Sequence, residues 1–274
     1  MTGNLVANDF FSTFESMCYT IQQLEERILK QGQRKQSTPG EIEEALRIFR
    51  EQIKGKPMFA ISGFDHPGLP ILIGQGGIHW QEMHWGLIPL WTKDWSAAME
   101  MSNMTLNARA ETVFEKLAFK HAVSTRRGLL PVTGFYEYKH VKGKKFPYFI
   151  DWSEEDVRWV ACVCDERRDH EKGQTLLTFA IVTTRGNSLM EEIHNNPELD
   201  EPRMPVFLEG ENLSKWLSNE TPLETLKAML KPLDDGHLRA HTVKPLRGKN
   251  SPGNTPDAYR KHDYAELYEP PTLF

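Results

Sequence analysis

Cysteine is scarce in this chain of 274 residues, which contains three, Cys18, Cys162 and Cys164. Three cysteines cannot all be paired, so the sequence argues against the disulfide framework of small secreted proteins. The chain also lacks any run of about 18 apolar residues, the length that a bilayer requires. Its first residues lack the basic and apolar regions of a secretion signal. Together these absences predict a soluble, cytoplasmic protein without a membrane partner.

An excess of positive charge is missing as well. The 33 Lys and Arg residues are outnumbered by 38 Asp and Glu residues, and the formal net charge is -5. Any contact with nucleic acid must therefore use a local basic surface. What is present is enough apolar material for a core, since 39% of the residues are hydrophobic and the length suits one large domain or two small ones.

Short apolar runs separated by Gly, Pro, Asn and Asp predict strands. These runs are 69–73, 78–85, 128–138, 146–152, 157–164 and 176–184. Helical patterns lie at 20–31, 38–54, 110–120, 186–193 and 211–230. The sequence therefore predicts an α+β fold that is strand-rich, with an antiparallel sheet or barrel and peripheral helices. We expect residues 1–16 to be an extension, 17–243 a single domain, and 244–274 an irregular C-terminal strap.

Several short motifs follow one another along the chain. They are Met17-Cys18, Trp85-Gly-Leu-Ile-Pro-Leu-Trp91, Leu106-Asn-Ala-Arg-Ala-Glu-Thr112, Gly134-Phe-Tyr-Glu-Tyr138, Ile193-His194 and Arg203-Met-Pro-Val206. In this order they resemble the SRAP family, the SOS response-associated peptidases or abasic-site processing proteins. The resemblance spans residues 17–208, and it implies an SRAP core for the predicted domain.

The resemblance also implies a site and a partner. The family's activity is DNA–protein cross-linking at abasic sites in single-stranded DNA, and its catalytic positions match Cys18, Asn107, Glu137 and His194. Its arginines that hold the DNA backbone match Arg109 and Arg203. Its segment that lies along the strand matches Trp85, Gly86, Leu87, Ile88 and Pro89.

The chemistry of Cys18 can be argued from the residue alone. An abasic deoxyribose opens to an aldehyde, and an α-amine with a pKa of about 8 is partly neutral near pH 7, so it can form an imine. The neighbouring thiol can then close on the imine carbon to give a five-membered thiazolidine. Only an N-terminal cysteine offers both groups in this arrangement, so Cys18 must first lose residues 1–17.

The other motif residues suit the remaining steps. His194 titrates near neutrality and can deliver a proton to oxygen. Glu137 is flanked by Tyr136 and Tyr138, and in such an apolar wall a carboxyl pKa tends upward, so Glu137 can shuttle protons. Asn107 suits orientation rather than proton transfer. Trp85 and Trp91 could stack on a base.

Each residue also has an ordinary structural interpretation. Taken singly, Cys18 is a small buried hydrophobe, His194 a histidine at a helix end, and Glu137 a strand carboxylate with a satisfied partner. Cys162 and Cys164 have poor zinc spacing and are predicted to pack in the core. We expect no metal and no cofactor.

Three departures from the family pattern matter. Sixteen residues precede Met17, so either translation begins at Met17, which we favour, or the extension is removed by proteolysis, including self-cleavage. Thr20 replaces an arginine that the family commonly carries. Residues 195–202 separate His194 from Arg203, and they are predicted to form a surface loop.

Two other functional classes stay open. A cysteine peptidase would use Cys18 as nucleophile, His194 as base and Asn107 as orienting group. A non-enzymatic binder of single-stranded DNA would use its arginines and tryptophans alone. For the cross-linking protein we expect a monomer, associated with the nucleoid when it is cross-linked.

Overall fold

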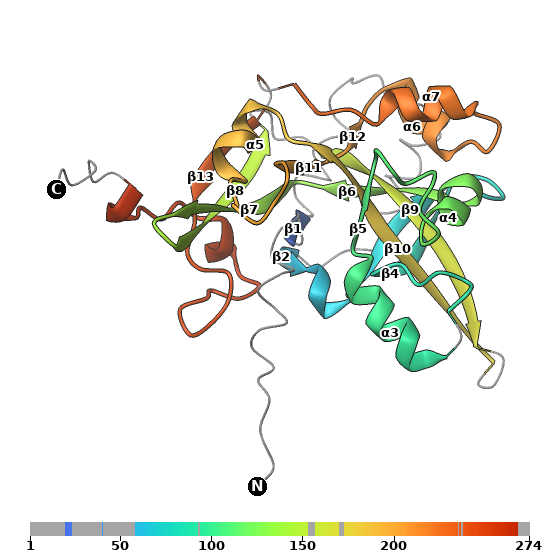
Figure 1. The fold of residues 1–274 in the computed structure, drawn as a ribbon, viewed down its shortest axis with the longest axis horizontal. Coiled ribbons are helices and arrows are strands. Elements are labelled where there is room, and N and C mark those ends of the chain that lie inside the picture. Colours follow the sequence, from blue (N-terminus) through green and yellow to red (C-terminus); the bar gives the residue numbers. More distant parts are fainter. Residues whose placement is uncertain are drawn as a thin grey trace, which may run out of the picture.

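A computed structural model describes residues 20–23, 40, 58–92, 94–152, 157–169, 173–234, 236 and 238–267. The strands are β1 Thr20–Gln23, β2 Met58–Ser62, β3 Gly68–Ile73, β4 His79–Trp85, β5 Asn107–Arg109, β6 Arg127–Val132, β7 Gly134–Val141, β8 Lys144–Trp152, β9 Arg158–Asp169, β10 Gln174–Arg185, β11 Arg203–Pro205, β12 Phe207–Leu208 and β13 Leu238–Thr242. The helices are α3 Trp95–Met104, α4 Lys120–Thr125, α5 Ser188–Ile193, α6 Glu211–Leu217 and α7 Leu223–Met229, with 3-10 turns at Gly63–Asp65, Pro256–Tyr259 and Ala265–Leu267. The expected strand-rich α+β fold is confirmed (Figure 1).

A closed barrel forms the larger part of the fold. Strands β10, β4, β3, β6 and β9 are neighbours in that order, and β9 pairs with β10 to complete the ring. All pairs in the ring are antiparallel except β4 with β10, which is parallel. Alternate residues of these strands point inward, and the inward set is apolar, including Leu69, Met83 and Phe179. Cys162 and Cys164 belong to this interior, so their predicted packing role is confirmed.

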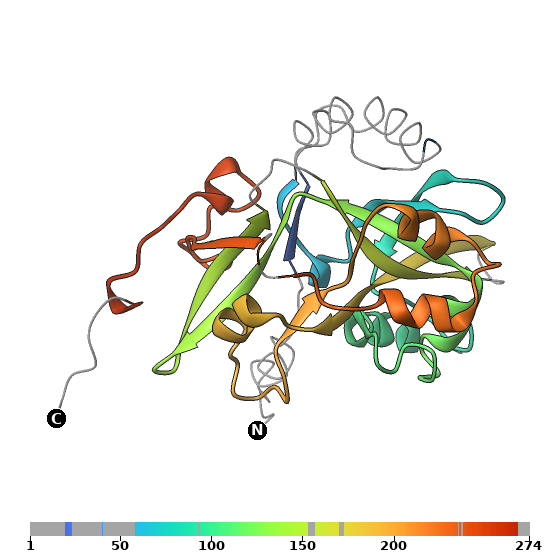
Figure 2. The same ribbon diagram turned by 90° about the horizontal axis from the view of Figure 1, so that it is seen from above.

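A second sheet lies against the barrel in the order β13-β8-β7-β1-β2. The chain passes from one sheet to the other at Thr133, whose N–H donates to the carbonyl of Gln22 at 2.8 Å. The predicted single strand 128–138 is therefore two strands, β6 in the barrel and β7 in the second sheet. Figure 2 shows the β7–β8 hairpin extending away from the barrel, with the C-terminal segment beyond it.

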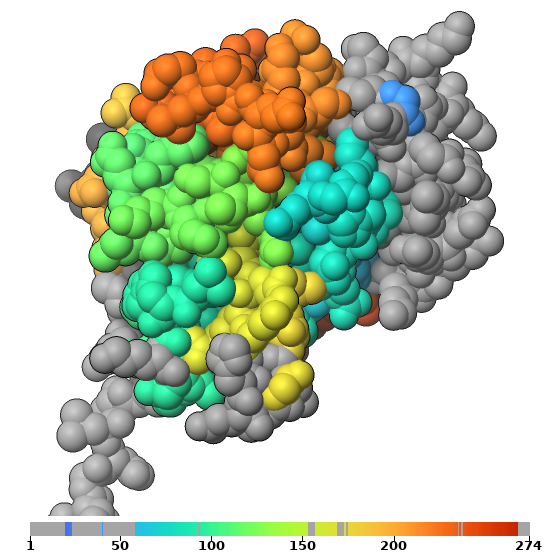
Figure 3. All heavy atoms as spheres, turned by 90° about the vertical axis from the view of Figure 1, so that its right-hand side faces the viewer, coloured from blue at the N-terminus to red at the C-terminus, as the bar shows by residue number. Residues whose placement is uncertain are grey.

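Helices cover the outside of the barrel. Residues on its outer face, such as Leu129 and Val163, form a second apolar cluster with Trp216 of α6 and Met229 of α7. In Figure 3, α6 and α7 (orange) lie beside the segment that contains α4 (green). None of the helices in the described part of the chain is long and apolar enough to cross a membrane.

Three predicted helices differ in the structure. Residues 20–23 form β1 between β2 and β7, because pairing on both sides outweighs a weak helical pattern; residues 24–31 lie outside the described range. Residues 110–119 form successive turns, and the helix begins only at Lys120. The predicted helix 211–230 is two helices, because Pro222 cannot continue a helix and instead caps the start of α7. Of the predicted helix 38–54, only Gly40 is described, and it is helical.

Candidate active site

Glu137 and His194 meet in the interior although 57 positions separate them along the chain. Glu137 lies on β7, and His194 is the residue that ends α5, where its N–H donates to the carbonyl of Met190 at 2.7 Å. The imidazole Nε2 lies 3.8 Å from Glu137 Oε2, and the two side chains are only 2% and 3% exposed. The sequence prediction that these two residues share a site is supported by their contact.

The second ring nitrogen of His194 is fixed by the backbone of Arg203. Nδ1 lies 3.1 Å from the Arg203 N–H and 3.0 Å from the Arg203 carbonyl. The N–H can donate to an unprotonated Nδ1, and the carbonyl can accept from a protonated one. Arg203 can therefore support either tautomer, so Nε2 can face Glu137 as a proton donor or as a proton acceptor.

Asn195 ties the residue after His194 to the same strand as Glu137. Its side-chain amide pairs twice with the backbone of His140, accepting from the N–H at 2.7 Å and donating to the carbonyl at 2.9 Å. Because His140 and Glu137 are both on β7, this pairing holds the end of α5 in register with the carboxylate.

Asn107 lies on β5, which pairs in parallel with β10 so that Asn107 is opposite Ile181. The residue is 6% exposed, and neither atom of its side-chain amide has a hydrogen-bond partner within the described residues. Buried amides are normally satisfied, so this unpaired amide is a candidate to bind a ligand. Ile181 and Phe135, which shares a strand face with Glu137, belong to one apolar cluster.

Sequence reasoning missed Thr183. It is fully buried, and its hydroxyl has no hydrogen-bond partner among the residues described. Because alternate strand residues share a face, Thr183 lies on the same side of β10 as Ile181, the cross-strand neighbour of Asn107. An isolated threonine in an apolar strand carries no sequence signal, and only the strand pairing makes this hydroxyl a candidate.

Arg109 and Arg203 have different environments. Arg109 is half-buried and lies opposite Thr183, and its guanidinium forms no hydrogen bond or ion pair within the described residues. Arg203 is fully buried. Its guanidinium donates to both oxygens of Glu111 at 3.0 and 2.7 Å, to Glu201 at 2.6 Å and to the Thr183 carbonyl at 2.9 Å. In this conformation a phosphate can therefore reach Arg109 but not Arg203.

Glu111 is held ionised by this arrangement. Partial burial raises its pKa, but the hydrogen bonds from Arg203 and the charges of Arg203 and Arg109 lower it by more, so the net pKa is below the usual value. The carboxylate therefore stays charged at neutral pH and compensates the buried guanidinium.

The segment Trp85-Gly-Leu-Ile-Pro corrects an expectation. Trp85, Leu87 and Ile88 are at most 1% exposed, Gly86 and Pro89 are also buried, and the Trp85 indole donates to the Leu106 carbonyl at 2.8 Å. Because these side chains form core, they cannot stack on a base in this conformation. By fixing Leu106 the segment positions the neighbouring Asn107. Trp91, by contrast, is 55% exposed.

Gly86 is required by its own geometry. Its φ is +114°, and a Cβ there would lie 2.7 Å from both the Ser102 carbonyl oxygen and the His66 ring. Only glycine adopts such a backbone readily while another chain segment lies this close. The glycine thus allows the turn between β4 and the segment that braces Leu106.

Two neighbours of the pair stay uncharged at neutral pH. Burial raises the pKa of Tyr138 to about 12, with Arg247 lowering it and Glu137 raising it. Burial also lowers the pKa of His140, which the neighbouring His194 lowers further and Glu198 raises. Tyr138 and His140 therefore add no charge beside the Glu137–His194 pair at neutral pH.

Cys18 lies outside the described residues, as does the whole of the predicted extension 1–16. The first residue that the structure describes is Thr20, at the start of β1. Thr20 is paired with Tyr136 on β7, and Tyr136 is next to Glu137. Among the residues described, no group of three or more His, Cys, Asp or Glu side chains is arranged to hold a metal ion.

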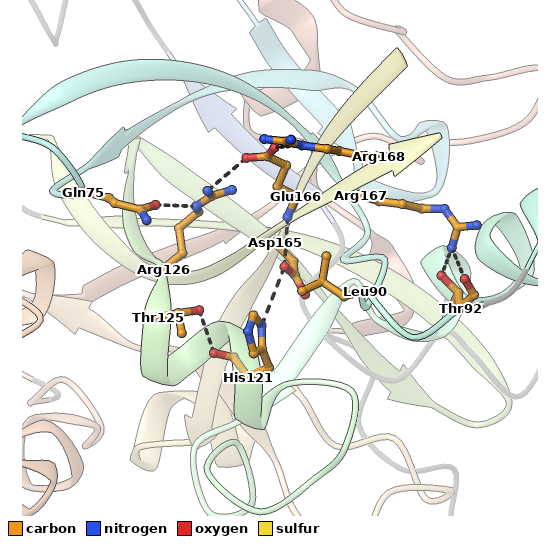
Figure 4. A pocket seen from close by; sticks show the side chains of 10 residues that line it. All are labelled: Gln75, Leu90, Thr92, His121, Thr125, Arg126, Asp165, Glu166, Arg167 and Arg168. Carbon is orange, nitrogen blue, oxygen red and sulfur yellow. Dashed lines mark hydrogen bonds and ion pairs between the residues drawn. The ribbon is translucent and has the colours of Figure 1, made fainter. Parts of the chain in front are cut away.

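A separate cavity of about 550 Å³ lies near the C-terminal end of β9, and neither Glu137 nor His194 lines it. Figure 4 shows the side chains that line it, which include Arg126, Arg167, Arg168, Asp165 and Glu166. Each arginine is already engaged: Arg126 and Arg168 each bind Glu166 at 3.0 Å, and Arg167 binds Thr92. Burial raises the pKa of Asp165, against the opposing effects of the Glu166 N–H and nearby cations. We therefore place the candidate site at Glu137 and His194.

The fold and the site define a strand-rich barrel protein with a buried carboxylate–imidazole pair beside the strand that begins at Thr20. The chain belongs to the SOS response associated peptidase (SRAP) family, a model of which matches residues 33–249. That range contains Asn107, Glu137 and His194, and it leaves Cys18 outside.

Similar proteins agree with this assignment. Abasic site processing protein YoqW of Bacillus subtilis (strain 168) is 35% identical over 184 residues, which cover 66% of this chain and 76% of that protein. Abasic site processing protein HMCES of Xenopus tropicalis is 28% identical over 195 residues, covering 64% and 55%. A crystal structure of a protein from Bacteroides thetaiotaomicron has a TM-score of 0.73 and 29% identity, and covers 89% of this chain and all of that chain.

Proposed function

We propose that this protein processes abasic sites in single-stranded DNA by forming a covalent DNA–protein cross-link through Cys18, after residues 1–17 are removed. The observation that carries the proposal is the buried contact between Glu137 and His194, on the strand that Thr20 joins. Its relatives YoqW and HMCES are named abasic site processing proteins, which supports abasic DNA as the substrate class.

Chain connectivity supports the role of Cys18. It precedes Thr20 by two residues, and a stretch of chain of that length spans at most about 7 Å. Thr20 is paired with Tyr136, and Glu137 is the next residue on β7. An amine and a thiol at Cys18 are therefore within reach of the region that contains Glu137 and His194.

The reaction is a condensation that releases one water. The ring-opened sugar presents an aldehyde at C1′, and the neutral α-amine of Cys18 attacks that carbon. Loss of water gives the imine, and addition of the thiol to the imine carbon gives the thiazolidine. No bond of the DNA backbone breaks in these steps, so the product is a protected abasic site.

Glu137 and His194 supply the protons. The sugar opens when its ring oxygen gains a proton and its hydroxyl loses one, and His194 can do either because Arg203 supports both tautomers. Glu137 accepts the proton that the amine loses on attack. Asn107 donates and accepts hydrogen bonds through an amide that no described residue satisfies, which orients the sugar hydroxyls.

The test uses a mature form that begins at Cys18 and a labelled oligonucleotide with one abasic site. We expect a heat-stable adduct on a denaturing gel, and none when borohydride has reduced the aldehyde to an alcohol. Glu137→Gln and His194→Gln should each slow its formation about 100-fold, the lower end of the contribution of a general acid or base. Cross-linking at the wild-type rate by Cys18→Ala would refute the proposal.

Cys18→Ser is the matched variant for the thiol. It keeps the amine, so it can form an imine that borohydride traps, but it cannot close a thiazolidine. Its adduct should therefore be lost on heating unless it is reduced. A heat-stable adduct of Cys18→Ser without reductant would show that the thiol takes no part.

Removal of residues 1–17 is a separate part of the proposal. While Cys18 has Met17 attached, its nitrogen is an amide and cannot form an imine. Protein that keeps residues 1–17 should therefore not cross-link. Mass spectrometry of the incubated full-length protein identifies self-cleavage, since a self-cleaving chain loses residues 1–17 and a His194→Gln chain should lose them more slowly.

A further inference from the structure

The loop between α5 and β11 projects from the body of the protein (Figure 2). Its acidic residue Glu201 contacts two arginines. One oxygen of Glu201 accepts from Arg203 Nη1 at 2.6 Å. The other lies 3.0 Å from Nε of Arg185, at the end of β10. The carboxylate therefore bridges two guanidinium groups.

The exposed fraction of the side chain decreases from Arg185 through Glu201 to Arg203. Arg185 is 73% exposed, Glu201 is 28% exposed and Arg203 is not exposed at all. Arg203 is next to the site, since its backbone contacts the His194 ring. Glu201 is thus the group that closes off the outer side of the Arg203 guanidinium.

Within the set of side chains joined by ion pairs, the charges balance only while Glu201 is in place; the charge of Arg109 also acts on Glu111, but Arg109 is not part of this set. Arg185 and Arg203 contribute two positive charges, and Glu111 and Glu201 contribute two negative charges. If Glu201 swings out, Glu111 stays on Arg203 through two hydrogen bonds. One positive charge is then uncompensated, which matches a single phosphodiester group.

A phosphate can take over the contacts that Glu201 makes. Both groups present two equivalent oxygens to guanidinium donors, and arginine binds both in the same planar manner. The vacated positions are Nη1 of Arg203 and Nε of Arg185. Glu201 therefore stands where an anion from outside would bind.

We propose that Glu201 blocks the Arg203 guanidinium until a backbone phosphate of single-stranded DNA displaces it, and that Arg185 then becomes a second donor to that phosphate; this rests on the proposed function for the identity of the anion. The exchange would reconcile the burial of Arg203 with the DNA contact that the family resemblance implies for it. The loop of residues 195–202, which carries Glu201, would then weaken DNA binding.

The test is the affinity for undamaged single-stranded DNA, which contains no aldehyde and cannot be cross-linked. Glu201→Gln keeps the shape of the side chain and removes its charge, so we expect binding about tenfold tighter at low salt, which is 1.4 kcal/mol. The slope of log affinity against log salt should change by much less than about 0.7, the value for one phosphate, because the same phosphate is neutralised in both proteins. Asp200→Asn removes the same charge from the same loop but forms no ion pair among the described residues, so it should have a much smaller effect.

Arg185→Gln is the second variant. The Arg185 side chain is 73% exposed, so its replacement should not impair folding. We expect weaker DNA binding with a slope shallower by about 0.7. The inference is overturned if Glu201→Gln binds DNA no tighter than Asp200→Asn, or if Arg185→Gln binds as wild type. Failure of cross-linking with a normal Glu201 effect would instead refute the proposed chemistry and leave this site intact.

Discussion

Replacing Glu111 by glutamine removes one of the two carboxylates that compensate the buried Arg203 guanidinium. Breaking a fully buried ion pair costs about 3–5 kcal/mol. The cost here is smaller, because the Glu111 side chain is 37% exposed and Glu201 still contacts Arg203. Glutamine also retains one oxygen that can accept a hydrogen bond. We therefore expect Glu111→Gln to lower the free energy of unfolding by about 2 kcal/mol.

Urea unfolding measures this value, provided that the dependence on urea concentration is unchanged. Glu115→Gln is the control, since Glu115 is exposed and forms no ion pair among the described residues, and it should change stability by less than about 0.5 kcal/mol. A Glu111→Gln protein as stable as wild type would show that Arg203 is not held by this pair, and the assignment of Arg203 as buried and compensated would fail.

Three further predictions concern residues outside the Glu137–His194 pair. Gly86→Ala should destabilise the protein by about 3 kcal/mol, because a Cβ at positive φ would meet the Ser102 carbonyl; wild-type thermal stability would refute this. Trp91→Ala should weaken binding of single-stranded DNA by about 1–3 kcal/mol without loss of stability, and unchanged binding would remove Trp91 from the DNA path. Because the folded pKa of His140 is lowered, the unfolded state binds its proton first, and stability should fall as pH drops below about 6.5. His140→Gln should flatten that dependence in unfolding measurements, and an identical pH profile would contradict the assignment.

Strands were the part of the fold most accessible from the sequence. The apolar runs at 69–73 and 146–152 differ from β3 and β8 by at most two residues, because buried strands are short and end at turn residues. Strands of two or three residues, such as β5 and β11, left no pattern, since their pairing with β10 depends on the closed barrel. Residues 110–119 failed as a helix because their turns serve tertiary contacts, including that of Glu111 with Arg203.

The site was predictable as a set of motifs but not as an arrangement. Glu137 and His194 followed from the resemblance, and their contact agrees with it. Trp85 was misjudged, since an aromatic residue beside glycine and proline gives no sign of whether it faces solvent or core. The partners of Arg203 were also hidden, because Glu111 and Glu201 are far apart in sequence and look like ordinary surface residues. Burial, which decides these roles, is a property of the assembled fold.

The most direct test of the central claim is the intact mass of the product formed by the Cys18 form and single-stranded DNA with one abasic site. The account predicts a heat-stable adduct whose mass equals protein plus DNA less one water, formed without reductant. In the same mixture, protein that still carries residues 1–17 should form no adduct. Absence of the adduct with the Cys18 form, or its presence with Cys18→Ala, would contradict the account.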